Sequence, residues 1–313
     1  MSIKENDAEI TFIVVNYLTT NDTIDCIKSL NENYPLSTIL VVDNSYALEP
    51  YAMKNSLKAI YNNSNDCENH DELELSGLVK FSAENSDCYL LNSLGNKGYG
   101  RAINIGYDFV KEYLQCKYFV VLNNDVVTID RFLDCLFLDM EREPNISCAT
   151  GKILWMDSSK TWYGGGEFNE LRMNVKHYDY PTSKYVSFIC GCFMLFRMKD
   201  FDRYRFDDDF FMYYEDVDIC RRMTFDGRLL FYNPKSIIYH KVSKSIVEKS
   251  QNAYIVNYKG RYLFINKYST IFKRILLFTL DAIKILFNPR IKVKTKWSVI
   301  KNMIPMVFYN IEK

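Results

Sequence analysis

The sequence predicts an α/β fold with a mostly parallel central sheet, followed by C-terminal helices. Three observations support this prediction. Short runs of β-branched and aliphatic residues alternate with stretches of helical spacing. The chain has 313 residues and is 48% apolar, which is enough to bury a sizeable core. Polar residues directly follow several of the predicted strands, where ligands bind in parallel sheets.

Four strands are predicted in the first half of the chain, because each run is almost continuously apolar and ends at turn residues. They are Ile10–Val15, Ile39–Val42, Tyr89–Leu91 and Tyr118–Leu122. Helices are predicted between them, near Thr20–Asn31, Tyr51–Tyr61 and Gly100–Tyr113. Strands that are apolar on both faces and alternate with helices are typical of a doubly wound parallel sheet.

Polar side chains close three of these strands. Asn16 and Tyr17 follow the first strand, and Asp43 follows the second. Asn124 and Asp125 come directly after the fourth. Because the carboxyl ends of parallel strands share one edge of the sheet, we expect these side chains to gather there.

The densest acidic stretch of the chain is residues 206–223, FDDDFFMYYEDVDICRRM. A helix that starts near Glu215 leaves Glu215 and Asp216 in its first turn, where the helix dipole stabilises carboxylates. Two interpretations are open. The acids either cap the helix and form a solvated face, or the adjoining aromatic residues shield them from water. Shielding raises the pKa of a carboxylate toward that of a working base.

The distribution of charge divides the chain into two regions. The formal net charge is zero, with 39 Lys/Arg and 39 Asp/Glu, which argues against a nucleic-acid partner. Residues 251–313 hold 12 Lys/Arg and 2 Asp/Glu, whereas residues 1–250 hold 27 and 37. The sequence therefore predicts an α/β domain over residues 1–248 and a basic, helical C-terminal region over residues 249–313.

The C-terminal region contains apolar helical segments joined by a basic stretch. In residues 268–287, polar residues recur on one narrow stripe: Thr270, Arg274, Asp281 and Lys284. The segment NPRIKVKTKW follows with four basic residues. Basic amphipathic helices of this kind lie in the interface of anionic membranes. The alternative is that their apolar faces pack on the α/β domain or on a second copy in a homodimer.

The N-terminal segment MSIKENDAEI has no apolar core of signal-peptide length, and no apolar run is long enough to span a bilayer. The nine cysteines are an odd number and include no pair of CxxC motifs at zinc spacing. We therefore expect a cytoplasmic protein with reduced cysteines. The basic helices add the expectation that it lies peripherally on the inner face of the cell membrane.

Seven short blocks occur in the order found in the inverting nucleotide-sugar glycosyltransferases of family 2, especially the rhamnosyltransferase-like members. The blocks are IVVNY (13–17), LVVDNS (40–45), NKGYGRAINIG (96–106), LNNDV (122–126), GCFMLFR (191–197), YEDVDICRR (214–222) and IIYHKVSKS (237–245). The chain resembles this family over about residues 10–245. The resemblance implies the GT-A fold for residues 1–248 and sugar transfer from a nucleotide-diphosphate donor. The acceptor it implies is a glycan or a lipid-linked saccharide of a bacterial surface polysaccharide.

The resemblance also implies which residues bind the donor. The base and ribose of the nucleotide would be held by Asn16, Tyr17 and Asp43. The wall that holds the nucleotide and its sugar would include Asn96, Gly98, Arg101 and Asn124. A divalent Mg²⁺ or Mn²⁺ that bridges the diphosphate would be bound by Asp125, with His240 as a second ligand.

The acidic helix would supply the chemistry in this resemblance. An acceptor hydroxyl that attacks the anomeric carbon must lose its proton, and a single carboxylate can take it. Asp216 is the residue we expect to act as this base, while Glu215 orients the acceptor. Arg222, two helical turns later, would pair with an acid or reach a phosphate.

Several alternatives remain open at this point. Rhamnose from dTDP-rhamnose is the leading donor, but a UDP-hexose would need only small changes in the pocket. The acidic motif Asn123–Asn124–Asp125 has a single carboxylate, which favours an inactive, membrane-associated relative that binds sugar nucleotides without turnover. A nucleotidyltransferase on a similar sheet would require a basic phosphate-binding first loop, and VVNYLTTND has none.

Overall fold

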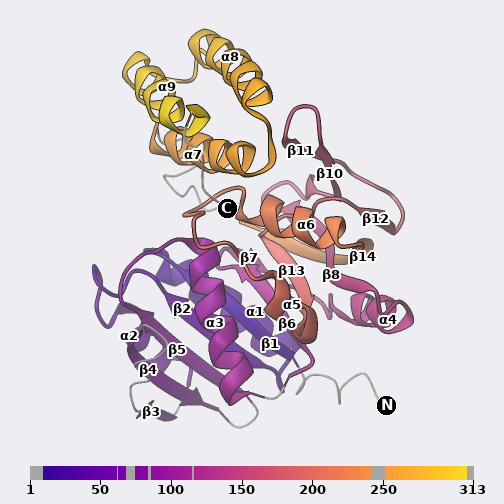
Figure 1. Cartoon of the computed structure of the whole chain (residues 1–313). Coiled ribbons are helices and arrows are strands. Elements are labelled where there is room, and N and C mark those ends of the chain that lie inside the picture. Colours follow the sequence, from indigo (N-terminus) through magenta and orange to yellow (C-terminus); the bar gives the residue numbers. More distant parts are fainter. Residues whose placement is uncertain are drawn as a thin grey trace.

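We describe a computed structural model of the chain, which covers residues 10–61, 63–67, 75–83, 86–114, 116–241 and 251–308. An α/β part contains one large mixed sheet, and three C-terminal helices are stacked against it (Figure 1). This arrangement confirms the predicted fold class.

A parallel core of four strands lies in the centre of the sheet. The strands run side by side in the order β6 (Tyr118–Asn123), β1 (Ile10–Asn16), β2 (Thr38–Asp43) and β5 (Asp87–Ser93). Every residue of β1 is buried, as expected of a strand covered on both faces. All four strands predicted from the sequence are confirmed.

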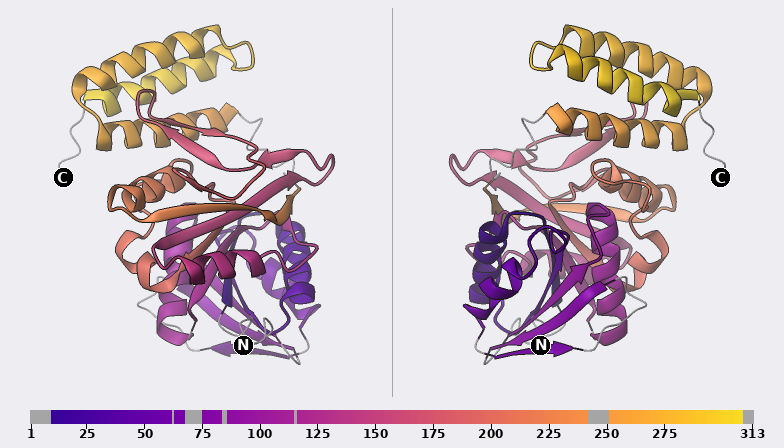
Figure 2. Two further views of the ribbon diagram at one scale, coloured as in Figure 1. Left: turned by 90° about the vertical axis from the view of Figure 1, so that its right-hand side faces the viewer. Right: turned by 90° about the vertical axis from the view of Figure 1, so that its left-hand side faces the viewer.

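Helices cover both faces of this core. The helices predicted between the strands are present as α1 (Thr20–Asn33), α2 (Ala52–Lys58) and α3 (Tyr99–Tyr113), of which α2 is shorter than predicted. Helix α3 lies on one face of the sheet and α1 on the other (Figure 2). Gly106 lets α3 approach the sheet closely, since a Cβ there would lie 2.9 Å from the Ile13 side chain.

Antiparallel strands extend the core on both sides. Beyond β6 the order is β13 (Phe193–Arg197), β8 (Ile146–Trp155), β14 (Leu229–His240) and β12 (Lys184–Val186), with β14 parallel to β8. Beyond β5 lie β4 (Leu75–Ser82) and β3 (Asn63–Cys67). Short strands complete this part: β7 (Val126–Val127) on β14, β9 (Thr161–Tyr163) on β8, and the hairpin of β10 (Gly166–Asn169) and β11 (Asn174–His177).

The second half of the α/β part also carries α4 (Asp134–Arg142), α5 (Met198–Tyr204) and α6 (Glu215–Phe225). Helix α6 begins at Glu215, as predicted from the stripe of apolar residues that follows it.

The C-terminal region folds into α7 (Gln251–Tyr268), α8 (Ile271–Phe287) and α9 (Val293–Phe308). Helix α7 lies between the α/β part and the other two helices (Figure 2). The predicted boundary at residues 248/249 falls in 242–250, outside the described residues. Among the described helices, none combines the length and the apolar character needed to cross a bilayer.

The two halves of the α/β part meet where α3 begins. Gly98 has a φ of +105°, which favours glycine, and a Cβ there would overlap the backbone carbonyl of Phe211 in the segment before α6. The backbone N–H of Tyr99 donates to the same carbonyl oxygen over 2.9 Å. Glycine at this position therefore permits the contact between α3 and the acidic segment.

Substitution of Gly98 by alanine should destabilise the protein by about 1–3 kcal/mol, because the new Cβ collides with backbone rather than with a flexible side chain. Gly95→Ala is the matched control: its φ is also positive, at +158°, but nothing lies within 4 Å of its Cβ position. Thermal unfolding of both variants checks the prediction. Equal losses of stability in the two variants would show that the positive φ, and not the contact with Phe211, requires glycine at position 98.

Candidate active site

A cavity of about 300 Å³ opens at the carboxyl ends of β1 and β6. Residues from both halves of the α/β part line it. Seven of the residues singled out in the sequence are among them: Tyr17, Asn96, Asn124, Asp125, Glu215, Asp216 and His240. The fold thus brings the rim of the parallel core and the acidic helix to one place.

Asn16 and Asp43 lie buried beneath the rim and do not line the cavity. The Asn16 side-chain amide donates to Asp43 Oδ1 over 2.9 Å and to Ser45 Oγ over 3.0 Å. Asn16 Oδ1 in turn accepts a hydrogen bond of 2.8 Å from the Thr23 hydroxyl. These bonds connect the ends of β1 and β2 to α1 and fix the position of the rim.

Asn96 and Asn124 line the cavity, and each also holds a neighbouring loop. Asn96 Oδ1 accepts a hydrogen bond of 3.0 Å from the Gly98 N–H. The Asn124 amide donates to the hydroxyls of Thr19 and Thr23 over 2.6 and 2.8 Å. Gly98 itself does not line the cavity, and its contribution is the close contact with Phe211.

The structure does not bring Arg101 or Arg222 to the cavity. Arg101 forms an ion pair of 2.5 Å with Asp208. The Arg222 guanidinium pairs with Asp218 over 2.7 Å, so it follows the first of its two predicted roles, pairing with an acid. Arg222 lines a separate cavity of about 410 Å³, which also includes Arg203 and Arg221.

Asp125 and His240 are brought together by strand pairing. Asp125 follows β6, and β7 then pairs with the end of β14, where His240 lies opposite Val126. His240 Nε2 is 2.9 Å from Asp125 Oδ1, and the two residues are 5% and 8% exposed. His240 Nδ1 is buried and has no hydrogen-bond partner among the described residues, and its ring packs nearly perpendicular to that of Trp162 at a centroid distance of 4.8 Å.

This pair can supply two ligands to a divalent cation. No group of three or more His, Cys, Asp or Glu side chains that could hold a metal occurs within the described part of the chain. A hard cation such as Mg²⁺ often takes only one or two protein ligands and completes its shell with phosphate oxygens and water. The donor set therefore fits a cation that is bound together with a diphosphate.

Asp216 and Glu215 occupy the first turn of α6 and line the cavity together with residues from the rim of β1. Asp216 accepts hydrogen bonds from the N–H groups of Gly191 and Val217, over 3.0 and 2.8 Å. Burial raises the pKa of Asp216 to about 6, and the two N–H groups act in the opposite direction.

Glu215 is 5% exposed, and its buried Oε2 has no hydrogen-bond partner within the part of the chain that the structure describes. Burial, followed by the neighbouring Asp216 carboxylate, raises the pKa of Glu215 well above its usual range. Burial therefore raises the pKa of both acids, and at Glu215 the neighbouring Asp216 carboxylate acts in the same direction as burial. A solvated acidic face, the other interpretation of the sequence, does not describe these two residues.

The segment before α6 has a constrained backbone. Tyr213 and Tyr214 are consecutive non-glycine residues with φ of +66° and +71°. Such conformations cost on the order of 1–3 kcal/mol each and persist where surrounding structure imposes them. Tyr213 lines the cavity, so this turn forms part of the wall beside Glu215 and Asp216.

Several cavity residues were not predicted from the sequence. Gly191 supplies the N–H that binds Asp216, and its carbonyl accepts a hydrogen bond of 2.9 Å from the Tyr99 hydroxyl. Gly191 belongs to the family-like block GCFMLFR (191–197), and this resemblance is the signal in the sequence that could have identified it. Trp162 and Met212 also line the cavity, and no periodicity or motif in the sequence indicates them.

Comparisons with known proteins place this geometry in context. No protein-family model matches the chain. Rhamnosyltransferase WbbL of Escherichia coli (strain K12) is 46% identical over 50 residues, which are 16% of this chain and 19% of that protein. This short match covers far too little of WbbL to compare whole proteins.

Solved structures share the overall fold. The structure of GalNAc-T7 with UDP, GalNAc and Mn²⁺ matches with a TM-score of 0.59 and 12% identity, over 95% of this chain and 54% of that chain. For S. aureus TarS 1–349 the TM-score is 0.53 with 10% identity, over 96% and 81% of the two chains. For mannosyltransferase PcManGT from Pyrobaculum calidifontis in complex with GDP-Man and Mn²⁺ it is 0.51 with 12% identity, over 97% and 87%. At these identities the matches show the fold, and the chain has the GT-A fold of these glycosyltransferases.

Proposed function

We propose that the chain is an inverting glycosyltransferase, which moves a sugar from a nucleotide-diphosphate donor to a hydroxyl of a glycan or lipid-linked acceptor. One observation carries the proposal: Asp125, His240 and Asp216 line the same cavity at the carboxyl ends of the parallel strands. Sugar transfer requires a place for a charged diphosphate and a base for the acceptor proton, and this cavity offers both.

In the proposed reaction, Asp216 acts as the general base. Its ionised carboxylate takes the proton from the acceptor hydroxyl while the acceptor oxygen forms a bond to the anomeric carbon. The bond between that carbon and the diphosphate breaks on the opposite side, and its electron pair leaves with the diphosphate oxygen. Attack on the face opposite the leaving group inverts the anomeric centre.

Glu215 lies beside Asp216, and burial favours its neutral form, which would donate a hydrogen bond to the acceptor and orient it. The N–H groups of Gly191 and Val217 hold both oxygens of Asp216, so the base keeps one orientation. Tyr17, Asn96 and Asn124 are placed to form the wall that receives the nucleotide and its sugar.

Asp125 and His240 would hold Mg²⁺ or Mn²⁺, which offsets negative charge on the departing diphosphate when bound. The structures of GalNAc-T7 and PcManGT contain Mn²⁺ together with UDP or GDP-Man, which supports a cation-assisted donor site in this fold. The single carboxylate of the Asn123–Asn124–Asp125 motif is compatible with this role, because His240 lies beside it.

Rhamnose from dTDP-rhamnose is the donor we propose first, since the family-like blocks and the short match to WbbL both favour it. A UDP-hexose is the second candidate. The product would belong to a bacterial surface polysaccharide such as an O-antigen or a capsule. An inactive sugar-nucleotide-binding relative is the remaining alternative, and it would be excluded by measuring turnover with a nucleotide-sugar donor.

The substitution Asp216→Asn should lower the transfer rate by about 10³-fold or more, because the amide keeps the shape of the carboxylate but cannot accept the proton. Donor affinity should stay within about threefold of the native value, since the nucleotide is bound by other residues. A panel of nucleotide sugars with Mn²⁺, assayed for transfer and for binding, tests both expectations. Asp209→Asn, on the exposed part of the acidic segment, is the control. Native-like turnover of Asp216→Asn would exclude Asp216 as the base.

The variants Asp125→Asn and His240→Ala should each weaken Mn²⁺ binding by about tenfold or more in the presence of UDP or dTDP. Each removes one of only two protein ligands, so the loss should be large. Isothermal titration of Mn²⁺ into the protein with nucleoside diphosphate measures it. His177→Ala controls for the loss of a histidine, because His177 does not line the cavity. Unchanged Mn²⁺ affinity in both variants would contradict the proposed site.

We also propose that the protein acts at the inner face of the cell membrane, with α8 and α9 in contact with anionic lipid. Two members of the polar stripe of α8 face inward, whereas Lys284 is exposed: Asp281 pairs with Arg261 of α7 over 2.8 Å, and Arg274 donates to the backbone carbonyl of Asn266 over 2.8 Å. Of the apolar side chains of α8, Leu277 and Ile285 are buried, whereas most of the others are exposed.

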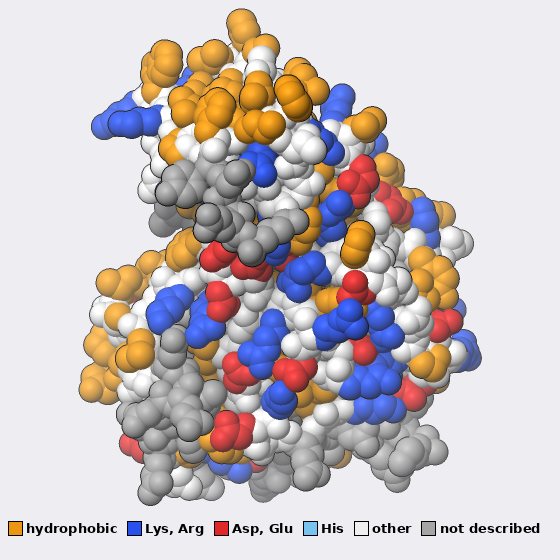
Figure 3. All heavy atoms as spheres, viewed as in Figure 1, with side chains coloured by type: hydrophobic (Ala, Val, Ile, Leu, Met, Phe, Trp, Pro, Cys, Tyr) orange, Lys and Arg blue, Asp and Glu red, His pale blue; other side chains and the backbone are white. Residues whose placement is uncertain are grey.

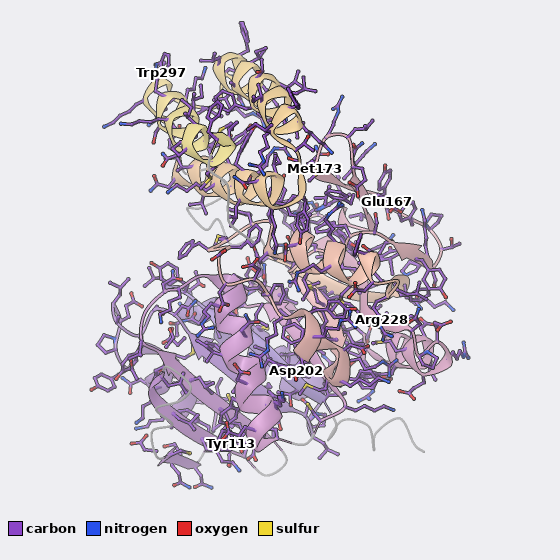
Figure 4. The ribbon with its side chains drawn as sticks, viewed as in Figure 1. Tyr113, Glu167, Met173, Asp202, Arg228 and Trp297 are labelled. Atoms are coloured by element: carbon purple, nitrogen blue, oxygen red, sulfur yellow. The ribbon has the colours of Figure 1, made fainter. Side chains whose placement is uncertain are left out.

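Twelve large apolar side chains of α8 and α9 are at least 40% exposed. They are Ile271, Phe272, Ile275, Leu276, Leu280, Ile283, Leu286 and Phe287 on α8, and Val293, Trp297, Ile304 and Phe308 on α9. They gather on the upper surface in Figure 3, and Trp297 stands on the outer side of α9 in Figure 4. An apolar surface of this size marks an interaction site.

The charges beside this surface favour an anionic membrane as the partner. Lys284, Arg290, Lys294 and Lys301 are exposed around the apolar side chains. The sole acid in residues 251–308 is Asp281, whose carboxylate is paired with Arg261 inside the helical region. Each basic residue near an anionic surface contributes about 1 kcal/mol of attraction, in addition to burial of the apolar side chains.

The double variant Phe272→Ser/Trp297→Ser should shift the protein from the vesicle fraction to the soluble fraction in flotation with anionic phosphatidylglycerol vesicles. Both residues are highly exposed, at 83% and 63%, so their replacement should leave the fold intact. Leu171→Ser is the matched control, because Leu171 is 83% exposed but lies in the β10–β11 turn. A native protein that fails to float, and instead forms a dimer that the double variant abolishes, would assign this surface to a second copy.

A further inference from the structure

Helix α7 touches the wall of the cavity through its backbone. Gly260 is buried in α7, and a Cβ at this position would lie 3.2 Å from the Met212 carbonyl oxygen and closer still to that of Tyr213. Met212 and Tyr213 line the cavity directly before Glu215 and Asp216. A residue without a side chain is therefore required where the helix crosses this turn.

Arg261, the next residue of α7, holds the same turn from the other side. Its guanidinium donates to the Tyr214 hydroxyl over 3.1 Å and to the backbone carbonyls of Met173 and Arg172 over 2.7 and 2.9 Å. Met173 lies where the β10–β11 hairpin meets α7 (Figure 4). The phenol of Tyr214, whose backbone is in the left-handed region, is thus anchored by a buried arginine that is 7% exposed.

The end of α7 holds the first turn of α6. Asp218, two residues after Asp216, is fully buried at 0% exposed. Its Oδ1 accepts hydrogen bonds from the Lys267 ammonium and the Tyr268 hydroxyl, over 2.8 and 2.7 Å, and Oδ2 pairs with Arg222. A buried carboxylate is costly unless it is paired and hydrogen-bonded, so Asp218 depends on α7 for two of these partners.

These contacts surround the two acids on the same short segment. Gly260 and Arg261 contact the turn that precedes Glu215, and Lys267 and Tyr268 bind the residue one half-turn after Asp216. Tyr213 and Tyr214 adopt conformations that non-glycine residues rarely hold without external support.

We infer that α7 is part of the catalytic unit and positions the general base: Gly260, Arg261, Lys267 and Tyr268 hold the turn at 213–214 and the start of α6 so that Asp216 faces the acceptor. The inference rests on the proposed role of Asp216. It replaces the division of the chain into a catalytic domain up to residue 248 and a separate helical region. In this arrangement, α8 and α9 provide the proposed membrane-binding surface, and they pack on α7, which the reaction already needs.

The test compares Gly260→Ala with Lys259→Ala in the full-length protein. Alanine ordinarily strengthens a helix in both positions, but only at Gly260 does the new Cβ push on the Tyr213 carbonyl. Gly260→Ala should lower kcat for transfer by about tenfold or more, with the donor KM and the nucleotide affinity within about threefold of the native values. Lys259→Ala should match the native enzyme.

Tyr268→Phe is a milder second variant, because it removes only the hydroxyl that binds Asp218. It should lower kcat by about threefold or more without a change in donor KM, whereas Tyr254→Phe, the same change elsewhere on α7, should have no effect. Native kcat in both Gly260→Ala and Tyr268→Phe would overturn the inference. Equal losses of kcat and of nucleotide affinity would also overturn it, because they indicate a general loss of structure. Asp216→Asn, assayed in parallel, separates the failures: if it retains turnover, the proposed base itself is wrong.

Discussion

Two backbone N–H groups hold the Asp216 carboxylate, and the chemistry of the cavity depends on that interaction. One N–H belongs to Gly191, in the segment that leads into β13, and the other to Val217 in α6. Burial raises the pKa of this acid while the N–H groups fix its direction. The carboxylate proposed as the base therefore keeps its position only while the antiparallel half of the sheet, α6 and the turn before it stay packed together.

The parallel and antiparallel halves contribute different parts of the site. The rim of β1, β2 and β6 carries the polar residues suited to a nucleotide, whereas β14 and α6 carry His240 and the two acids. His240 reaches Asp125 across 115 positions of sequence because the long strand β14 pairs with β8 and ends against β7. The C-terminal helices also contribute to the site, because α7 packs on the turn beside the acids. Helices α8 and α9 instead expose apolar side chains.

The sequence predicted what depends on local patterning. The strands of the parallel core and the start of α6 at Glu215 follow from runs of apolar residues and their spacing. Trp162 and the N–H of Gly191 enter the cavity through long-range pairing of β8, β9 and β13, which no local pattern reveals. The pairing of Arg222 with an acid was within local reasoning, because Asp218 lies four residues earlier on the same helix. On α8 the periodicity located a polar stripe, but only the contacts in the structure show that its members Arg274 and Asp281 face inward while Lys284 is exposed.

The central claim is that one cavity holds the diphosphate at Asp125 and His240 and presents the sugar to Asp216. A crystal structure of the protein with Mn²⁺ and an unreactive sugar-nucleotide analogue tests this most directly. Our account predicts that the cation contacts Asp125 and His240, and that the Asp216 carboxylate faces the anomeric carbon from the side opposite the diphosphate. A nucleotide bound in the arginine-lined cavity around Arg203 and Arg222, or an anomeric carbon turned away from Asp216, would contradict it.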